Sequence, residues 1–205
     1  MFSTTEVRWF YQGAVPPTVW QWFAAPNREI SAQPPRIDYY LRIVDGDGLG
    51  IKLREGRIEV KQRYDQQGTV HFGDRVAGKV EQWRKWSFPL AEAEHMMAEL
   101  DEGLSSWVGV YKEREVRTLQ MIDGAVVDVS GTVFLDHGCG WEVAQVRLET
   151  TNALWWSVGF EAFGEEAVRG EMIGAIAGHI LAMDNAPVLE LKDSCGYPKW
   201  LQVVI

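Results

Sequence analysis

The sequence has few cysteines, no excess of positive charge and no long apolar run. Its 205 residues include only Cys139 and Cys195, too few for the disulfide framework of a small secreted domain. The formal charge is −9, whereas nonspecific binding to nucleic acid or to an acidic membrane needs a basic face. The longest apolar helix-like stretch, Met172–Met183, is too short to span a bilayer. We therefore expect neither nucleic acid nor a membrane as a partner.

We expect no secretory signal at the beginning of the sequence. Glu6 and Arg8 lie within the first ten residues, and no apolar run follows them. A length of 205 residues suits one domain, which we expect to span residues 1–205. Together with the low cysteine content, these features predict a cytoplasmic protein.

Tryptophan and alternating apolar and polar residues are abundant. The chain has ten tryptophans, and large rings favour the pleated, half-buried surface of a sheet. Short turn signals such as Glu55–Gly56 separate several of the alternating segments, which indicates an antiparallel meander. The predicted strands are residues 4–10, 37–44, 50–55, 57–64, 69–73, 79–88, 107–121, 131–135, 141–149 and 154–164.

Three segments have helical character. They are Thr18–Ala25, Leu90–Leu100 and Glu165–Met183, and the last is the clearest because its acidic first turn suits the helix dipole. The tail, Leu189–Ile205, is expected to be irregular or to add one last strand. Strands and helices do not alternate, which argues against a doubly wound parallel sheet. The pattern predicts an α+β fold, mainly antiparallel β: a closed or nearly closed tunnel-like barrel of about eight strands with flanking helices.

Charged side chains gather on one face of several predicted strands. Because successive side chains of a strand point to opposite faces, Lys52 and Arg54 oppose Ile51 and Leu53. These charged faces form either the solvated outer surface of a sheet or the wall of an inward-facing polar tunnel that binds an anion. The pattern itself leaves both interpretations open. The same alternation recurs at Glu6 and Arg8, at Glu59 and Lys61, at Lys79 and Glu81, and at Lys112 and Arg114.

Short charged motifs also follow one another in a particular order. They are Thr4-x-Glu6-x-Arg8, Asp38-Tyr39-Tyr40-Leu41, Lys52-x-Arg54, Glu59-x-Lys61, Lys79-x-Glu81, Lys112-x-Arg114, Gly159-x-Glu161 and the terminal Gly196-Tyr197-Pro198-Lys199-Trp200-Leu201. This order resembles the CYTH, or triphosphate tunnel metalloenzyme, family. The resemblance spans nearly the whole chain and implies a single CYTH-like tunnel barrel.

The resemblance also implies roles for individual residues. The tunnel would bind a small phosphorylated or otherwise anionic ligand, such as a triphosphate or a nucleotide. Glu6 and Glu161 would hold Mg²⁺ or Mn²⁺. The family has a glutamate pair in each of two motifs, but here Thr4 and Gly159 stand in place of the first glutamates, which leaves metal-dependent hydrolysis open. The implied anion-binding residues are Arg8, Lys52, Arg54, Lys61, Lys112 and Arg114.

Two further functions fit the same residues. A catalytically inactive tunnel barrel would bind an organic anion or a protein partner, and Thr4 and Gly159 favour this alternative. A lipocalin-like binder of an apolar ligand would carry the charges outside and the tryptophans within. Gly73–Lys79 nearly matches a P-loop, but Val80 replaces its hydroxyl residue and a strand is expected next. Asp136–Cys139 offers metal-ligand types without a second pair at zinc spacing, so a loop is expected there.

Overall fold

The computed structural model describes residues 1–24, 32–91, 106–131 and 135–205. Its helices are α1 (Pro17–Phe23), α3 (Glu166–Leu181) and α4 (Tyr197–Val204), with a single 3-10 turn at Leu191–Asp193. Its strands are β1 (Phe2–Gln12), β2 (Ala32–Leu41), β3 (Leu49–Arg54), β4 (Arg57–Phe72), β5 (Val76–Pro89), β6 (Trp107–Ile122), β7 (Ala125–Asp128), β8 (Gly138–Leu148) and β9 (Leu154–Phe163).

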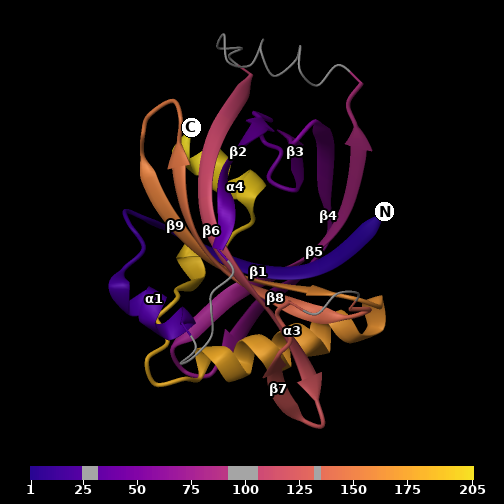
Figure 1. Ribbon diagram of the computed structural model, residues 1–205, viewed down its shortest axis with the longest axis vertical. Coiled ribbons are helices and arrows are strands. Elements are labelled where there is room, and N and C mark those ends of the chain that lie inside the picture. The colour runs from indigo at the N-terminus through magenta and orange to yellow at the C-terminus, as the bar shows by residue number, and fades with distance from the viewer. Residues whose placement is uncertain (25–31, 92–105, 132–134) are drawn as a thin grey trace.

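Eight of the strands close into an antiparallel barrel. The order around the ring is β2-β3-β4-β5-β1-β9-β8-β6, and β6 pairs back to β2. The short strand β7 extends β6 outside this ring (Figure 1). The predicted fold class, a mainly antiparallel closed barrel of about eight strands with flanking helices, is confirmed.

Three local predictions need correction. The expected strand at residues 69–73 is the end of β4, because two irregularities in its pairing with β5 carry the strand past Gly68 without a turn. Strand β7 was not expected. The tail forms α4 rather than an irregular segment or a strand, with Pro198 in its first turn and Trp200 and Leu201 buried. The predicted helix at Leu90–Leu100 and strand at Gly131–Leu135 lie largely outside the described residues.

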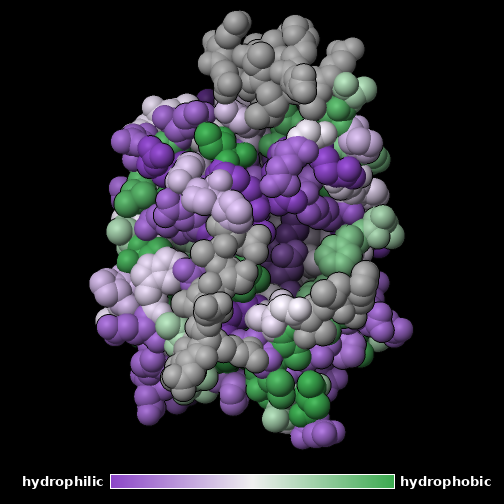
Figure 2. Space-filling view, viewed as in Figure 1, coloured by the Kyte–Doolittle hydropathy of each residue, from purple (hydrophilic) through white to green (hydrophobic). Residues whose placement is uncertain are grey.

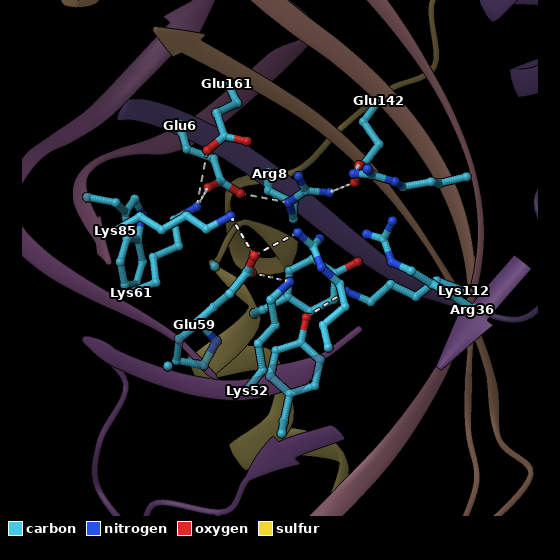
Figure 3. Close-up of a pocket in the computed structure, with 18 residues that line it drawn as sticks. Glu6, Arg8, Arg36, Lys52, Glu59, Lys61, Lys85, Lys112, Glu142 and Glu161 are labelled. Carbon is cyan, nitrogen blue, oxygen red and sulfur yellow. Dashed lines mark hydrogen bonds and ion pairs between the residues drawn. The ribbon is translucent and has the colours of Figure 1, made fainter. Parts of the chain in front are cut away.

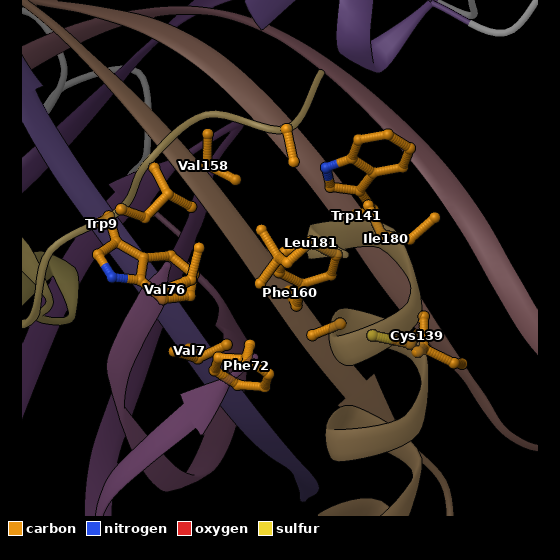
Figure 4. Packing of buried hydrophobic residues seen from close by; sticks show 14 of the residues in the cluster. Val7, Trp9, Phe72, Val76, Cys139, Trp141, Val158, Phe160, Ile180 and Leu181 are labelled. Atoms are coloured by element: carbon orange, nitrogen blue, oxygen red, sulfur yellow. The ribbon is translucent and has the colours of Figure 1, made fainter. Parts of the chain in front are cut away.

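The main hydrophobic core lies on the outer side of the barrel wall. Val7 and Trp9 of β1 and Phe160 of β9 point outward, and they belong to one buried cluster with Ile173 and Ile176 of α3. Helix α1 contributes further buried side chains to the same cluster. Figure 4 shows part of this cluster, with Val7, Trp9 and Phe160 of the strands beside α3. Because the two faces of a strand alternate, the helices that cover this apolar face leave the other face to line the interior.

Charged side chains therefore point into the barrel. Glu6 and Arg8 alternate with Val7 and Trp9 along β1 and are almost completely buried. The interpretation of these faces as a solvated outer surface is wrong, and so is the lipocalin-like arrangement with charges outside. The barrel has a polar interior and an apolar outer layer beneath α1 and α3.

Helix α4 forms one end of the interior. Trp200 stacks on Phe10 with ring centroids 4.8 Å apart, and Tyr197 stacks on Tyr40 at 5.7 Å. These contacts seat the aromatic face of a short helix against the inner wall of the barrel. In the described part of the chain, no helix is long and apolar enough to cross a membrane.

Candidate functional site

A cavity of about 140 Å³ lies inside the barrel, and charged side chains dominate its lining. Eight lining residues are cations and four are carboxylates, drawn from all eight strands of the ring (Figure 3). The cations are Arg8, Arg36, Lys52, Arg54, Lys61, Lys85, Lys112 and Arg114, and the carboxylates are Glu6, Glu59, Glu142 and Glu161. Every residue that the sequence predicted for anion or metal binding lies in this lining.

The cavity has an excess of positive charge, although the whole chain carries −9. Asp38 lies just behind the lining with 0% of its surface exposed, and it adds a fifth carboxylate. Eight cations against five carboxylates leave three positive charges in excess. Charges enclosed by protein interact more strongly than charges in water, so this excess attracts anions. Figure 2 shows hydrophilic side chains gathered around a recess in one face of the molecule.

Asp38 is the shared counter-ion of three cations. Its carboxylate lies 3.1 Å from Arg36 Nε, 3.2 Å from Lys52 Nζ and 3.2 Å from Lys112 Nζ. Burial alone would raise the pKa of Asp38, but these cations outweigh it and hold the pKa far below its usual value. Lys112 Nζ also lies 3.7 Å from the centre of the Tyr197 ring.

Glu142 bridges two guanidinium groups. Its oxygens lie 2.6 Å from Arg8 Nη1 and 2.8 Å from Arg114 Nη1. Burial raises the pKa of Glu142, but Arg8 and Arg114 lower it well below the usual range. Arg8 and Arg114 also line a second cavity of about 300 Å³, so this ion-pair group stands between two hollow regions.

Gly159 makes room for the guanidinium of Arg8. A Cβ atom at this position would lie 2.6 Å from Arg8 Cζ, closer than carbon atoms approach. The sequence identified Gly159 as the loss of a carboxylate. In the folded barrel, the missing side chain instead allows Arg8 to lie against β9 and reach Glu142.

Glu59 gathers three cations at the opposite side of the cavity. Arg54 Nη2 lies 2.6 Å from Glu59 Oε1, Lys52 Nζ 3.0 Å from Oε2, and Lys85 Nζ 3.1 Å from Oε1. Burial raises the pKa of Glu59, but the neighbouring cations, Lys52 foremost, lower it to about 2. Asp38, Glu59 and Glu142 therefore each lie beside two or three cationic groups, more than one carboxylate neutralises.

Glu6 and Glu161, the implied metal ligands, face each other across β1 and β9. The Lys61 ammonium contacts Glu6 Oε2 and lies 3.4 Å from Glu161 Oε1, while Arg8 Nε lies 2.8 Å from Glu6 Oε1. Burial raises the pKa of Glu6, but Lys61 and Arg8 lower it to about 2. Among the described residues, no group of three His, Cys, Asp or Glu side chains is arranged to hold a metal ion. These residues do not fit a resident Mg²⁺ or Mn²⁺.

Sequence reasoning missed several members of the site. Arg36, Lys85 and Glu142 line the cavity but were not among the predicted site residues. Lys85 shares a strand face with Lys79 and Glu81, so the period-two alternation could have identified it. Arg36 follows two prolines, and Glu142 stands alone between Trp141 and Val143 as the one charged residue of an apolar stretch. Their positions follow from strand pairing, which a single sequence does not contain.

The other motifs find structural roles. Gly73 lies in the tight turn between β4 and β5, and Lys79 lies on β5, so the near match to a P-loop is a β-hairpin. The segment Asp136–Cys139 leads into β8, where Cys139 is buried under the outer hydrophobic cluster.

Two lysines of the cavity predict a pH-dependent affinity. Burial lowers the pKa of Lys52 and of Lys112 to about 8 in each case, although Asp38 opposes this effect. An anion bound in the cavity would favour the charged lysine, so its affinity would be highest below this pKa and would fall as the pH rises through it. For trimetaphosphate, whose charge is constant here, we expect Kd to rise about tenfold or more between about pH 8 and about pH 9.5.

The control for this titration is Lys52→Arg, because the arginine keeps its proton throughout the range. Calorimetric titration should show that the Kd of this variant for trimetaphosphate changes less with pH than the Kd of the wild type. A wild-type Kd that is constant up to about pH 9.5 would contradict the assignment of both lysines to anion binding.

Comparison with known proteins adds no family to this picture. No protein-family model matches the sequence, and no curated protein matches it. The resemblance to CYTH barrels stays a prediction, and the function has to be argued from the cavity itself.

Proposed function

We propose that the barrel binds a small anion with several negative charges, and that a polyphosphorylated molecule is the leading class of ligand. The observation that carries this proposal is the excess of three positive charges inside a closed barrel. An excess of this kind costs free energy unless solvent or a ligand neutralises it, because like charges in an enclosed space repel. A compact polyanion would supply the missing counter-charge.

Arginine donors that face the cavity suit phosphate oxygens. Among the described contacts, Arg54 and Arg114 each pair with one carboxylate, and their side chains are 21% and 28% exposed. A planar guanidinium with unused N–H groups can hold a phosphate or carboxylate through two parallel hydrogen bonds.

Three of the four carboxylates that line the cavity favour binding over hydrolysis. A general base has to accept a proton during the reaction, which works best when its pKa lies near the working pH. Glu6 and Glu59 have pKa values lowered to about 2, and Glu142 is lower still. We therefore propose a binding protein, which corresponds to the catalytically inactive barrel among the alternatives raised by the sequence.

Calorimetric titration with tripolyphosphate tests the binding proposal. Arg54→Met and Arg114→Met should each weaken binding by about tenfold or more, since each removes a charged hydrogen-bond donor to the ligand. Arg147→Met is the matched control, because Arg147 is exposed on β8 and lies outside the cavity lining. Equal affinity in all four proteins, or no binding by the wild type to tripolyphosphate or ATP, would refute the proposal.

The same proteins, together with Glu161→Gln, decide between binding and hydrolysis. Phosphate release from tripolyphosphate, ATP and thiamine triphosphate should stay at background with Mg²⁺ or with Mn²⁺. Turnover that disappears in both Arg54→Met and Glu161→Gln would instead establish a phosphohydrolase.

A further inference from the structure

Three carboxylates lie side by side at one end of the cavity. Glu81 on β5, Glu6 on β1 and Glu161 on β9 are register partners across neighbouring strands. Glu6 and Glu81 are 4% and 3% exposed. Like charges directly opposite each other destabilise a sheet, so this row of three needs cations between its members.

Strand β4 supplies these cations. Lys61 places its ammonium between Glu6 and Glu161, and Arg63 Nη1 lies 2.6 Å from Glu81 Oε1. Both cations also lie over the Trp83 ring, with Lys61 Nζ 5.3 Å and Arg63 Cζ 5.9 Å from its centre. The ammonium is thus held by two carboxylates and one aromatic face, and the dashed lines in Figure 3 mark its contacts with Glu6 and Glu161.

A divalent cation at this end would need the same carboxylate oxygens. Mg²⁺ and Mn²⁺ bind oxygen ligands in near-octahedral geometry, and Glu6 and Glu161 are the carboxylates that face the cavity here. Lys61 belongs to the barrel itself, so its ammonium has a high effective concentration beside these carboxylates. A free divalent cation in solution does not reach that concentration and competes poorly. Displacing Lys61 would also leave an ammonium in the protein interior without its two counter-ions.

We infer that Lys61 is a built-in counter-ion that takes the place of a divalent metal, and that the cavity accepts its polyanion in the metal-free form. The second part rests on the proposed function. A polyphosphate bound to Mg²⁺ carries less negative charge and brings a hydrated metal ion into a wall of cations. The eight lining cations favour the free anion, whose charge is higher.

Magnesium should therefore weaken the binding of tripolyphosphate. We expect the apparent Kd to rise as the inverse of the fraction of ligand that stays free of Mg²⁺, reaching about tenfold when about nine tenths is complexed. Trimetaphosphate, which binds Mg²⁺ weakly, is the matched ligand and should show a much smaller change. An increase in tripolyphosphate affinity with Mg²⁺ would overturn the inference. Absence of binding with and without Mg²⁺ would refute the proposed function instead.

Manganese binding without any anion tests the role of Lys61 independently. Electron paramagnetic resonance should detect no stoichiometric Mn²⁺ on the wild type at millimolar concentrations. Lys61→Met should bind one Mn²⁺ at least tenfold more tightly, and Lys61→Met with Glu161→Gln should lose that site. Lys61→Arg keeps the charge and should behave as the wild type does.

The wild-type measurement stands even if Lys61→Met does not fold, because one tightly bound Mn²⁺ on the wild type would overturn the inference. A folded Lys61→Met protein that binds Mn²⁺ no better than the wild type would overturn it as well. Circular dichroism of each variant establishes which of them are folded.

Discussion

Replacing Arg8 by methionine is expected to lower the free energy of unfolding by about 3–5 kcal/mol, the range found when a buried ion pair loses one partner. Arg8 is 6% exposed and joins Glu6 to Glu142. Without its guanidinium, both carboxylates stay in the interior with fewer counter-charges. Urea unfolding followed by tryptophan fluorescence measures the loss.

The pH dependence of this loss has a definite sign. In the wild type, the pKa of Glu142 is lowered, so its contribution to stability is present near neutral pH and is lost as the pH falls through that pKa. In Arg8→Met, Glu142 has one guanidinium fewer beside it, so protonation removes a poorly neutralised charge from the interior. The difference between the two proteins should therefore shrink on acidification.

A second substitution separates the effect of the lost ion pair from the effect of changed side-chain packing at Arg8. Glu142→Gln in the Arg8→Met background removes one of the stranded charges and should recover about 1–2 kcal/mol. If Arg8→Met costs less than about 1 kcal/mol, or if the double variant is no more stable than the single one, the ion-pair group does not stabilise the barrel as described.

Replacing Asp38 by asparagine is expected to change stability and affinity in opposite directions. Asp38 is completely buried and serves Arg36, Lys52 and Lys112, so its loss should cost about 3–5 kcal/mol of unfolding free energy. At mildly acidic pH, where Lys52 and Lys112 keep their protons even without Asp38, the same substitution raises the positive excess in the cavity from three to four. A polyanion should therefore bind Asp38→Asn about tenfold more tightly.

Thermal melts with and without tripolyphosphate measure both effects in one experiment. Without ligand, Asp38→Asn should have a lower melting temperature than the wild type. When ligand is added, its melting temperature should rise by more than that of the wild type, because tighter binding stabilises the folded state more. Asp74→Asn is the control, since it changes the net charge equally on an exposed turn. A weaker affinity in Asp38→Asn would mean that Asp38 positions the cations rather than merely neutralising them.

The alternation along the strands predicted which side chains share a face, and the barrel confirms it. It did not predict which face is inside, because Val7 and Trp9 could have filled the barrel as readily as they pack under α3. The deciding fact is that the helices cover the apolar face, which brings residues about 170 positions apart, such as Val7 and Ile176, into one buried cluster.

The ion pairs of the cavity and helix α4 could not be predicted from the sequence, for related reasons. Arg8 and Glu142 are 134 positions apart, and strand pairing alone brings them together. Helix α4 has eight residues, which is too short for the periodicity of a helix to be distinctive. The spacing of Tyr197, Trp200 and Leu201 fits one helical face, but two aromatic residues and a leucine fit a strand as well.

The closure of the ring has a kinetic consequence. The cavity draws its lining from all eight strands, and β2 must meet β6 across a long stretch of chain before the ring is complete. Such nonlocal pairings must overcome loop-closure entropy first, so barrels of this kind fold in about milliseconds to seconds. Contacts that form after the rate-limiting step slow unfolding rather than speed folding. A ligand held by the finished cavity would therefore prolong the lifetime of the folded protein without helping it to form.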